Sequence, residues 1–342
     1  MSLFEVKPVD AAFYRERLME FLPDRLFDVH VHLYQRAHNT RRDERTVSWP
    51  GRVADCNPAE DLVETAELMF PGKGYRSLVF GTLTDVCDMD VSNQYVSESA
   101  AKMGWPALMF AHPGLSQQAL ADGLKKGGFR GIKVYLSYAP PHIPVGDIRV
   151  FDFLPREQLE VCDRLGMAVM LHLPRSQRLR DPMNIADLLE IERDFKHLRL
   201  IVAHVGRAYC REDVGEAVDI LSKTENMVFD ISANTNEWVF ARLIEAVGGS
   251  RILYGSDLPV TRMRMRRVER DGRYVNLAPR GLYGDVSDDP NMGELDPPES
   301  DRLTYFLYEE IEAFRRAALE TGLQKDDIDR VFRANGEALF FP

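Results

Sequence analysis

The stretch Arg25-Leu26-Phe27-Asp28-Val29-His30-Val31-His32 is an apolar run that carries two histidines one residue apart. Successive side chains of a β-strand point to opposite faces, so His30 and His32 share one side. Two neutral imidazoles side by side are a chelating pair for a metal ion. The same pattern also occurs at ordinary strand ends, so the rest of the chain has to decide between the two interpretations.

Seven further apolar segments follow, each preceded by a segment with helical spacing of its apolar residues. We predict strands at 77–83, 107–113, 131–136, 168–173, 198–204, 227–232 and 251–257, and helices at 58–69, 91–103, 116–126, 155–165, 185–195, 214–222 and 237–246. Near-continuous apolar strands that alternate with amphipathic helices indicate a parallel sheet covered on both faces. Eight such units in about 250 residues predict an α/β fold of the closed (β/α)₈, or TIM, barrel type.

An open doubly wound sheet is the alternative. A dinucleotide-binding sheet of that kind carries a glycine fingerprint after its first strand. This chain has Asp28-Val29-His30-Val31-His32 there, which favours the barrel.

The rhythm of strands and helices organises residues 1–342 as a single domain. We expect a leading helix within 8–25, the barrel core at 26–257, a long loop at 258–298 and closing helices at 299–342. The connection after the first strand, about 33–57, is also long. Loops of this length are often functional, because a rigid scaffold positions them over a site.

The composition restricts the classes of partner. The chain has 342 residues, 45% of them hydrophobic, and a net charge of −11, which is typical of a globular protein that repels nucleic-acid phosphates. No apolar run approaches the roughly 20 residues that a membrane helix needs. The four cysteines, Cys56, Cys87, Cys162 and Cys210, form no Cys-x-x-Cys pair. We therefore expect a cytoplasmic protein that acts on a small molecule and binds neither nucleic acid nor membrane.

Oligomeric state is less well defined by the sequence. Trp49, Tyr274 and Tyr283 are aromatic residues of the two long loops. Aromatic side chains are enriched in subunit contacts, so a homo-oligomer is an alternative to a monomer.

Polar residues end several of the predicted strands. In a parallel barrel the carboxyl ends of all strands open on one face, where the catalytic groups of this fold collect. Residues of these types rarely end an apolar strand unless they are paired or bound to something. The set that should meet at this face consists of His30, His32, Lys133, His172, His204 and Asp257.

These residues, together with three sequence motifs, carry a family resemblance. The motifs are Ala203-His204-Val205-Gly206, Tyr254-Gly255-Ser256-Asp257 and the ending from Val331 to Phe340. The chain resembles the amidohydrolase superfamily of metal-dependent barrel enzymes from Phe27 to Phe340. It is most similar to the branch that contains aminocarboxymuconate-semialdehyde decarboxylase and related small-acid hydrolases and hydratases.

The resemblance implies that His30, His32, His172 and Asp257 are the ligands of one divalent metal. Three imidazoles and a carboxylate suit Zn²⁺, with Mn²⁺ or Fe²⁺ as alternatives. Asp257 is then the general base, and His204 and Lys133 stabilise negative charge that develops on the substrate. A second metal is expected only if Lys133 is carboxylated. Asp230 should either orient a metal-bound imidazole or accept a hydrogen bond from a neighbour's N–H.

A second set of residues is predicted to bind the substrate. Guanidinium groups bind carboxylates through two parallel hydrogen bonds, so arginines near the barrel mouth are candidates. We predict contacts from Arg175, Arg207, Arg262 and Arg264, and from Tyr135, which stands where related proteins often have a histidine. The opposing interpretation is a solvated basic run paired with the protein's own acids.

Three functions remain after these arguments. The first is a metal-dependent hydrolase that activates water to cleave an amide, lactone or ester bond of a small, acidic metabolite. The second is a non-oxidative decarboxylase or hydratase that uses the same site. The third is a barrel that binds without catalysis, and it is disfavoured because every ligand position holds a competent residue.

Overall fold

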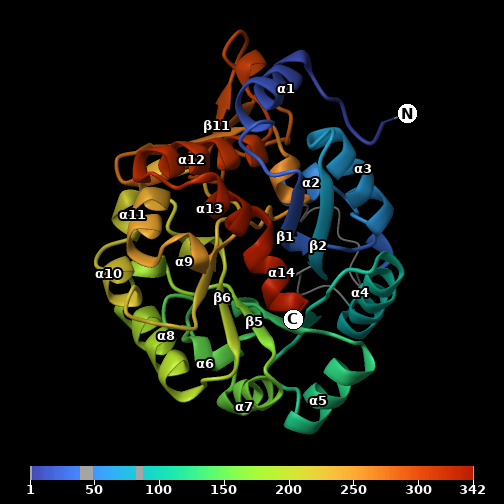
Figure 1. Ribbon diagram of the computed structural model, residues 1–342, viewed down its shortest axis with the longest axis vertical. Coiled ribbons are helices and arrows are strands. Elements are labelled where there is room, and N and C mark those ends of the chain that lie inside the picture. The colour runs from blue at the N-terminus through green and yellow to red at the C-terminus, as the bar shows by residue number, and fades with distance from the viewer. Residues whose placement is uncertain (1, 39–48, 82–87, 342) are drawn as a thin grey trace.

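In the computed structural model, which describes residues 2–38, 49–81 and 88–341, helices surround a central set of strands (Figure 1). The strands that follow the predicted rhythm are β1 (Arg25–His32), β2 (Gly74–Phe80), β3 (Met109–Phe110), β4 (Gly131–Val134), β5 (Ala168–Leu171), β6 (Arg199–Val202), β7 (Val228–Asp230) and β8 (Ile252–Leu253). Each of them begins and ends within a few residues of a predicted strand.

Hydrogen bonds connect these strands into a ring. β1 pairs in parallel with β2, and β3 to β8 form a six-stranded parallel sheet in sequence order. Parallel bridges join Val79 of β2 to Ala107 just before β3, and Val31 of β1 to Leu258 just after β8. Both gaps between the two sheets are therefore spanned, which confirms the (β/α)₈ barrel.

Helices cover the outside of the ring. Between the strands lie α2 (Trp49–Val53), α3 (Ala59–Met69), α4 (Met89–Met103), α5 (Gln117–Lys126), α6 (Val150–Phe153), α7 (Arg156–Leu165), α8 (Pro182–Asp194), α9 (His204–Arg207), α10 (Ala217–Leu221) and α11 (Glu237–Val247). The ends of the chain add α1 (Pro8–Phe13), which continues as a π-turn, and α12 (Phe306–Thr321), α13 (Lys325–Asp329) and α14 (Asn335–Phe340). No helix among the described residues is long and apolar enough to span a bilayer.

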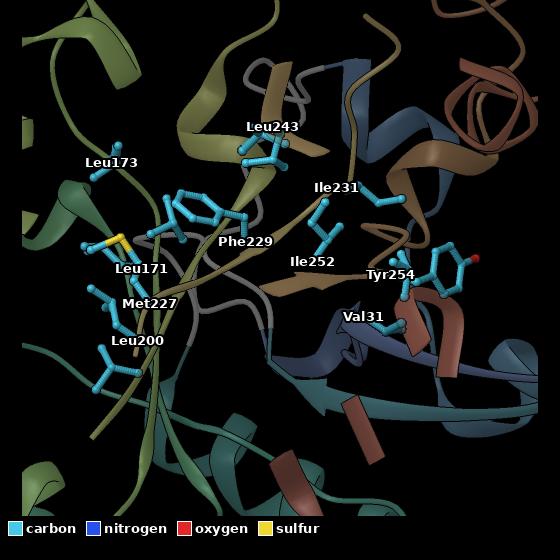
Figure 2. Close-up of a cluster of buried hydrophobic side chains, with 14 of the residues drawn as sticks. Val31, Leu171, Leu173, Leu200, Met227, Phe229, Ile231, Leu243, Ile252 and Tyr254 are labelled. Carbon is cyan, nitrogen blue, oxygen red and sulfur yellow. The ribbon is translucent and has the colours of Figure 1, made fainter. Parts of the chain in front are cut away.

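Strand alternation sorts the buried side chains into two layers. In β5, Val169 and Leu171 belong to the large cluster between strands and helices, whereas Ala168 and Met170 belong to a second cluster with Phe27 and Phe340. Figure 2 shows the first layer, with side chains from β1, β5 to β8 and α11 gathered against one another. The second layer fills the barrel axis, because its residues point the opposite way along the same strands.

A register shift in β1 modifies the simple alternation. The pairing of β1 with β2 slips between Asp28 and Val31. Beyond the slip, Val31 and Leu33 belong to the outer layer. Since His30 and His32 alternate with them, both imidazoles face the barrel interior, as the sequence predicts.

The segment after β8 differs from the predicted loop at 258–298. It contains a three-stranded sheet made of β9 (Arg266–Arg270), β10 (Arg273–Pro279) and β11 (Met292–Leu295). β9 and β10 form an antiparallel hairpin whose turn residues, Asp271 and Gly272, have φ values of 50° and 71°. Asp-Gly at positive φ is the turn chemistry of tight hairpins, so this signal was present in the sequence.

The structure bears on the predictions for the loop aromatic residues and the cysteines. Tyr283 is buried, and its hydroxyl accepts a hydrogen bond from the Arg264 N–H at 2.6 Å, so it packs within the chain. Cys162 and Cys210 are buried free thiols and Cys56 is half-buried. Cys87 and the side chain of Trp49 lie outside the described residues.

Candidate metal centre

The carboxyl end of β1 and the segment after β8 bring three predicted ligands together. The Asp257 N–H donates to the His30 carbonyl at 2.8 Å, and the His32 N–H donates to the Leu258 carbonyl at 2.9 Å. As a result, donor atoms of His30, His32 and Asp257 all lie within 4.8 Å of one another. The Nε2 atoms of His30 and His32 are 3.5 and 3.2 Å from Oδ1 of Asp257.

In both rings Nδ1 is held by a hydrogen bond, which leaves Nε2 as the nitrogen that faces Asp257. Nδ1 of His30 lies 2.9 Å from Oδ2 of Asp230, and Nδ1 of His32 lies 2.9 Å from the Gly81 carbonyl. Carboxylate and carbonyl oxygens only accept, so both Nδ1 atoms carry the hydrogen. Burial, reinforced by the charge of Lys133, lowers the pKa of His30 to about 3, which leaves its Nε2 as a bare lone pair.

This arrangement fits a divalent cation. Nε2 of His30 is buried without a hydrogen-bond partner among the described residues, and it faces the Asp257 carboxylate oxygen across 3.5 Å. Two lone pairs opposed in this way repel each other unless a cation lies between them. In a tetrahedral zinc site with bonds of about 2.0–2.2 Å, neighbouring donor atoms are about 3.3–3.6 Å apart, close to the separations found here.

Asp230 and Ser232, at the end of β7, support the imidazoles from behind. Asp230 accepts from His30, from the Ser232 hydroxyl and, at 2.9 Å, from the His204 backbone N–H. The Ser232 hydroxyl lies 3.2 Å from Nδ1 of His30 and 2.9 Å from Nδ1 of His204. Both contacts predicted for Asp230 are therefore present: it holds the imidazole of a ligand candidate, and it accepts a neighbour's backbone N–H.

His204 stands on a strained left-handed turn. Its φ is 56°, and the next three residues, Val205, Gly206 and Arg207, have φ values of 50°, 62° and 65°. Such a conformation costs roughly 1–2 kcal/mol for each residue that is not glycine, and strain of this kind collects at functional sites. The turn places the His204 ring 4.7 Å from the His30 ring and keeps its Nδ1 on the Ser232 carbonyl at 3.1 Å.

His172 and Lys133 complete the constellation from β5 and β4. The half-buried ring of His172 lies 5.4 Å from that of His204, and its Nδ1 has no hydrogen-bond partner within residues 2–38, 49–81 and 88–341. It is not one of the three residues that share the 4.8 Å group. Lys133 is fully buried, and its Nζ also lacks a hydrogen-bond partner in the part of the chain that the structure describes. Burial lowers the pKa of Lys133 to about 8, against the attraction of Asp230 and Asp257.

Three of the predicted substrate contacts lie beside this cluster. The centre of the Tyr135 ring lies 4.7 Å from that of the His172 ring, with the two planes tilted by 58°. Arg207 donates to the Leu173 carbonyl at 3.1 Å and to the Arg175 carbonyl at 3.2 Å, so it borders the loop that follows His172. Arg175 forms an ion pair with Asp181 at 2.9 Å, which already compensates its charge. Within the described part of the chain, no ion pair is formed by Arg207.

The two arginines predicted on the loop after β8 are engaged elsewhere. Arg264 is buried and donates to both carboxylate oxygens of Asp10, at 2.8 and 2.6 Å, so its guanidinium is already paired within the chain. Arg262 reaches Thr65 at 3.2 Å and stacks over Phe4. For Arg264 the opposing interpretation, pairing with the protein's own acids, is the one that the structure supports.

Sequence reasoning missed Ser232, although a signal was present. Asp230 and Ser232 are separated by one residue at the end of a strand, the same spacing as His30 and His32. That spacing places both side chains on one face. A hydroxyl is too common at strand ends to be selected without knowledge of its neighbours.

Fold and site together define a (β/α)₈ barrel whose strand ends carry an imidazole and carboxylate cluster suited to a divalent metal. The amidohydrolase family model matches residues 27–341, so the chain belongs to the amidohydrolase family. The family assignment makes it an enzyme of the metal-dependent amidohydrolase superfamily.

Solved structures show the same fold at low sequence identity. A 2,6-dihydroxybenzoate decarboxylase from Rhizobium has a TM-score of 0.57 at 14% identity, covering 93% of this chain and 99% of its own. A probable 2-pyrone-4,6-dicarboxylic acid hydrolase from Acinetobacter baumannii with bound citric acid has a TM-score of 0.56 at 13% identity, with coverages of 92% and 98%. A zinc-bound amidohydrolase from Burkholderia multivorans has a TM-score of 0.56 at 12% identity, again with coverages of 92% and 98%. No curated protein sequence matches the chain.

Proposed function

We propose that this enzyme is a metal-dependent hydrolase that cleaves an amide, lactone or ester bond of a small compound bearing a carboxylate. One observation carries the proposal: His30 is neutral, and its unpartnered Nε2 faces the Asp257 carboxylate beside Nε2 of His32. This arrangement raises the free energy of the protein when no cation is bound, and it becomes favourable when a cation lies between the donor atoms.

The proposed ligands are His30, His32, His172 and Asp257, with zinc as the first candidate and manganese or iron as alternatives. A single ion needs no change to Lys133, whereas a second would require carboxylation of its Nζ. A bound divalent ion supplies Lewis acidity, which polarises a substrate oxygen and lowers the pKa of water in contact with it.

The protein's own groups manage the proton and the developing charge. Asp257 is 15% exposed in its side chain and lies at the mouth, where its carboxylate can accept a proton from water and return it to the leaving group. Lys133 brings an unpartnered ammonium, and Nε2 of His204 is directed away from Ser232. Lys133 would stabilise an oxyanion in this water-poor site, and His204 would do so once its Nε2 is also protonated.

Arg207 is the proposed contact for the substrate's carboxylate. Burial lowers the pKa of His172 most, and the positive charge of Arg207 lowers it further. The same charge lowers the pKa of Tyr135 against the effect of burial, so the guanidinium lies near both rings. A cation at the mouth that has no acidic partner among the residues the structure describes favours an anionic substrate.

Decarboxylation of a carboxylic acid is the second candidate, and it is equally supported. The same cations, Lys133 and Arg207, would hold a carboxylate near the ligands, and one of the similar folds is a hydroxybenzoate decarboxylase. Hydration of a small acid is a third use of the same groups.

Hydrolysis and decarboxylation differ in whether they release or consume protons, and this difference can be measured. The zinc-loaded protein should be offered a pyrone dicarboxylate lactone and a dihydroxybenzoate in a pH-stat with detection of carbon dioxide. Lactone cleavage releases acid without carbon dioxide, whereas decarboxylation consumes a proton and liberates the gas. Turnover of the benzoate alone would replace the hydrolase proposal by the decarboxylase one.

A further inference from the structure

One residue of the turn after β7 contacts two imidazoles. Ser232 places its hydroxyl between Nδ1 of His30 and Nδ1 of His204, and its carbonyl also accepts from His204. A shift of the Ser232 backbone would therefore redirect both rings. The conformation of this turn matters for the direction in which both Nε2 atoms point.

The residue that follows holds an unfavourable backbone conformation. Ala233 has a φ of 50°, in the left-handed region that costs a residue with a Cβ roughly 1–2 kcal/mol. Strain of this size persists only where surrounding groups determine the geometry. Both polar backbone groups of Ala233 have such a partner: its N–H donates to Oε2 of Glu310 at 2.7 Å, and its carbonyl accepts from Nη1 of Arg267 at 2.6 Å.

Both partners come from segments that follow the barrel, one of them buried by packing and the other held by further contacts. Glu310 lies on α12 and has no exposed surface. Arg267 lies on β9, donates from Nε to Asn276 at 2.8 Å, and has its guanidinium 4.5–4.7 Å from the ring centres of Tyr209, Tyr274 and Phe306. Side chains restrained in this way can transmit a fixed position to the turn.

We propose that Glu310 and Arg267 are positioning residues of the metal centre. By holding the two backbone groups of Ala233 they fix Ser232, and through Ser232 they set the orientation of His30 and His204. The inference rests on the proposed function, since it requires a metal to be bound. It gives the hairpin β9–β10 and helix α12 a role in the site although neither supplies a ligand candidate.

A purely structural role makes a different prediction. In that case, loss of either side chain would lower the free energy of unfolding and leave the rate of zinc release unchanged. Arg251 offers a matched control, because it also donates to backbone carbonyls beside β7 but at the opposite end, to Met227 at 2.9 Å and Thr224 at 2.6 Å.

The test measures zinc release, independently of any substrate. The wild type and the variants Glu310→Leu, Glu310→Gln, Arg267→Met and Arg251→Met are loaded with zinc and mixed with a chromophoric chelator, and unfolding by urea is measured separately. We expect Glu310→Leu and Arg267→Met to release zinc about tenfold faster. Glu310→Gln keeps an acceptor for the Ala233 N–H and should release zinc at close to the wild-type rate, as should Arg251→Met whatever its stability.

Two failures are distinguishable. A wild type that takes up no zinc contradicts the proposed function itself. If the wild type binds zinc but Arg267→Met and Glu310→Leu release it no faster, or if Arg251→Met accelerates release equally, the positioning role is overturned. Should Glu310→Leu fail to fold, Arg267→Met and its control decide the question.

Discussion

At the scale of single residues, the two nitrogens of His30 have separate tasks. Nδ1 donates to Asp230, and Nε2 faces the Asp257 carboxylate. A carboxylate partner on Nδ1 fixes the tautomer and raises the basicity of the nitrogen that binds the metal. The geometry of the cluster thus depends on residues that are not themselves ligand candidates.

Replacing Asp230 tests this dependence. Asp230→Asn keeps the size of the side chain but removes the charge that His30 and Ser232 contact. We expect the zinc dissociation constant to rise about 10- to 100-fold, measured by competition with a chelator. Asp187→Asn, which disturbs a buried pair with Arg149 instead, is the control. Equal zinc affinity in Asp230→Asn and wild type would exclude the orienting role.

Arg207 permits a second test at this scale. Once an acidic substrate is found, Arg207→Ala should raise its KM about 10- to 100-fold, the value of one charge-assisted hydrogen bond. The KM of a neutral analogue should change little. Arg180→Ala, at a more exposed arginine, serves as the control. An equal rise for acidic and neutral compounds would show that Arg207 supports the loop instead of binding the anion.

Residue roles were predictable from sequence only where spacing carries the information. His30, His32 and Asp257 could be selected because strand ends of a barrel converge, whatever their distance in sequence. The pairing of Arg264 with Asp10 spans 254 residues and depends on packing of α1 against the segment 258–298 after β8, called the excursion below, which no local pattern shows. The roles of Glu310 and Arg267 were missed for the same reason.

At the scale of elements, the excursion after β8 is tied to the start of the chain by that buried pair. Arg264 donates twice to Asp10, which also accepts from the Thr304 hydroxyl at 2.8 Å. Breaking a buried pair leaves an uncompensated charge, and this costs more than the intact pair contributes.

The pair predicts an asymmetric effect on stability. Arg264→Met should lower the free energy of unfolding by about 3–5 kcal/mol, measured by urea denaturation. The double variant Asp10→Asn with Arg264→Met should recover part of this loss, because the orphaned charge is gone while the Thr304 contact is kept. If Arg264→Met were as stable as the wild type, the ion pair of Arg264 with Asp10 would not anchor the excursion to the start of the chain.

Element boundaries show where sequence patterns are informative. The eight barrel strands were placed because apolar runs and helical spacing alternate along the chain. The strands of the excursion were missed because their side chains are largely charged or half-buried, so neither an apolar run nor a clean alternation marks them. Only the Asp271-Gly272 turn could have indicated the hairpin.

At the scale of the whole molecule, Glu310 links stability to pH. Burial raises its pKa well above the ordinary 4.5, against the hydrogen bond from Ala233 and together with the charges of Asp28, Asp230 and Asp257. The folded protein therefore keeps a proton that the unfolded chain releases above pH 4.5. Stability from this group is fully present below that pH and falls as the pH rises towards the folded pKa.

A variant without this proton isolates the effect. Relative to Glu310→Gln, the wild type should lose free energy of unfolding progressively above about pH 4.5, and the two proteins should run parallel below it. Urea unfolding at a series of pH values measures the difference. A constant difference across pH 4 to 8 would show that Glu310 is ionised in the folded protein.

The central claim is that His30, His32, His172 and Asp257 hold one divalent metal at the mouth of the barrel. The most direct test is metal content, measured by mass spectrometry after equilibration with zinc or manganese and removal of the free ion, for the wild type and for His30→Ala and His32→Ala. We predict about one metal per chain in the wild type and a loss of most of it in each variant. A wild type that retains no metal, or variants that retain as much as the wild type, would contradict the claim.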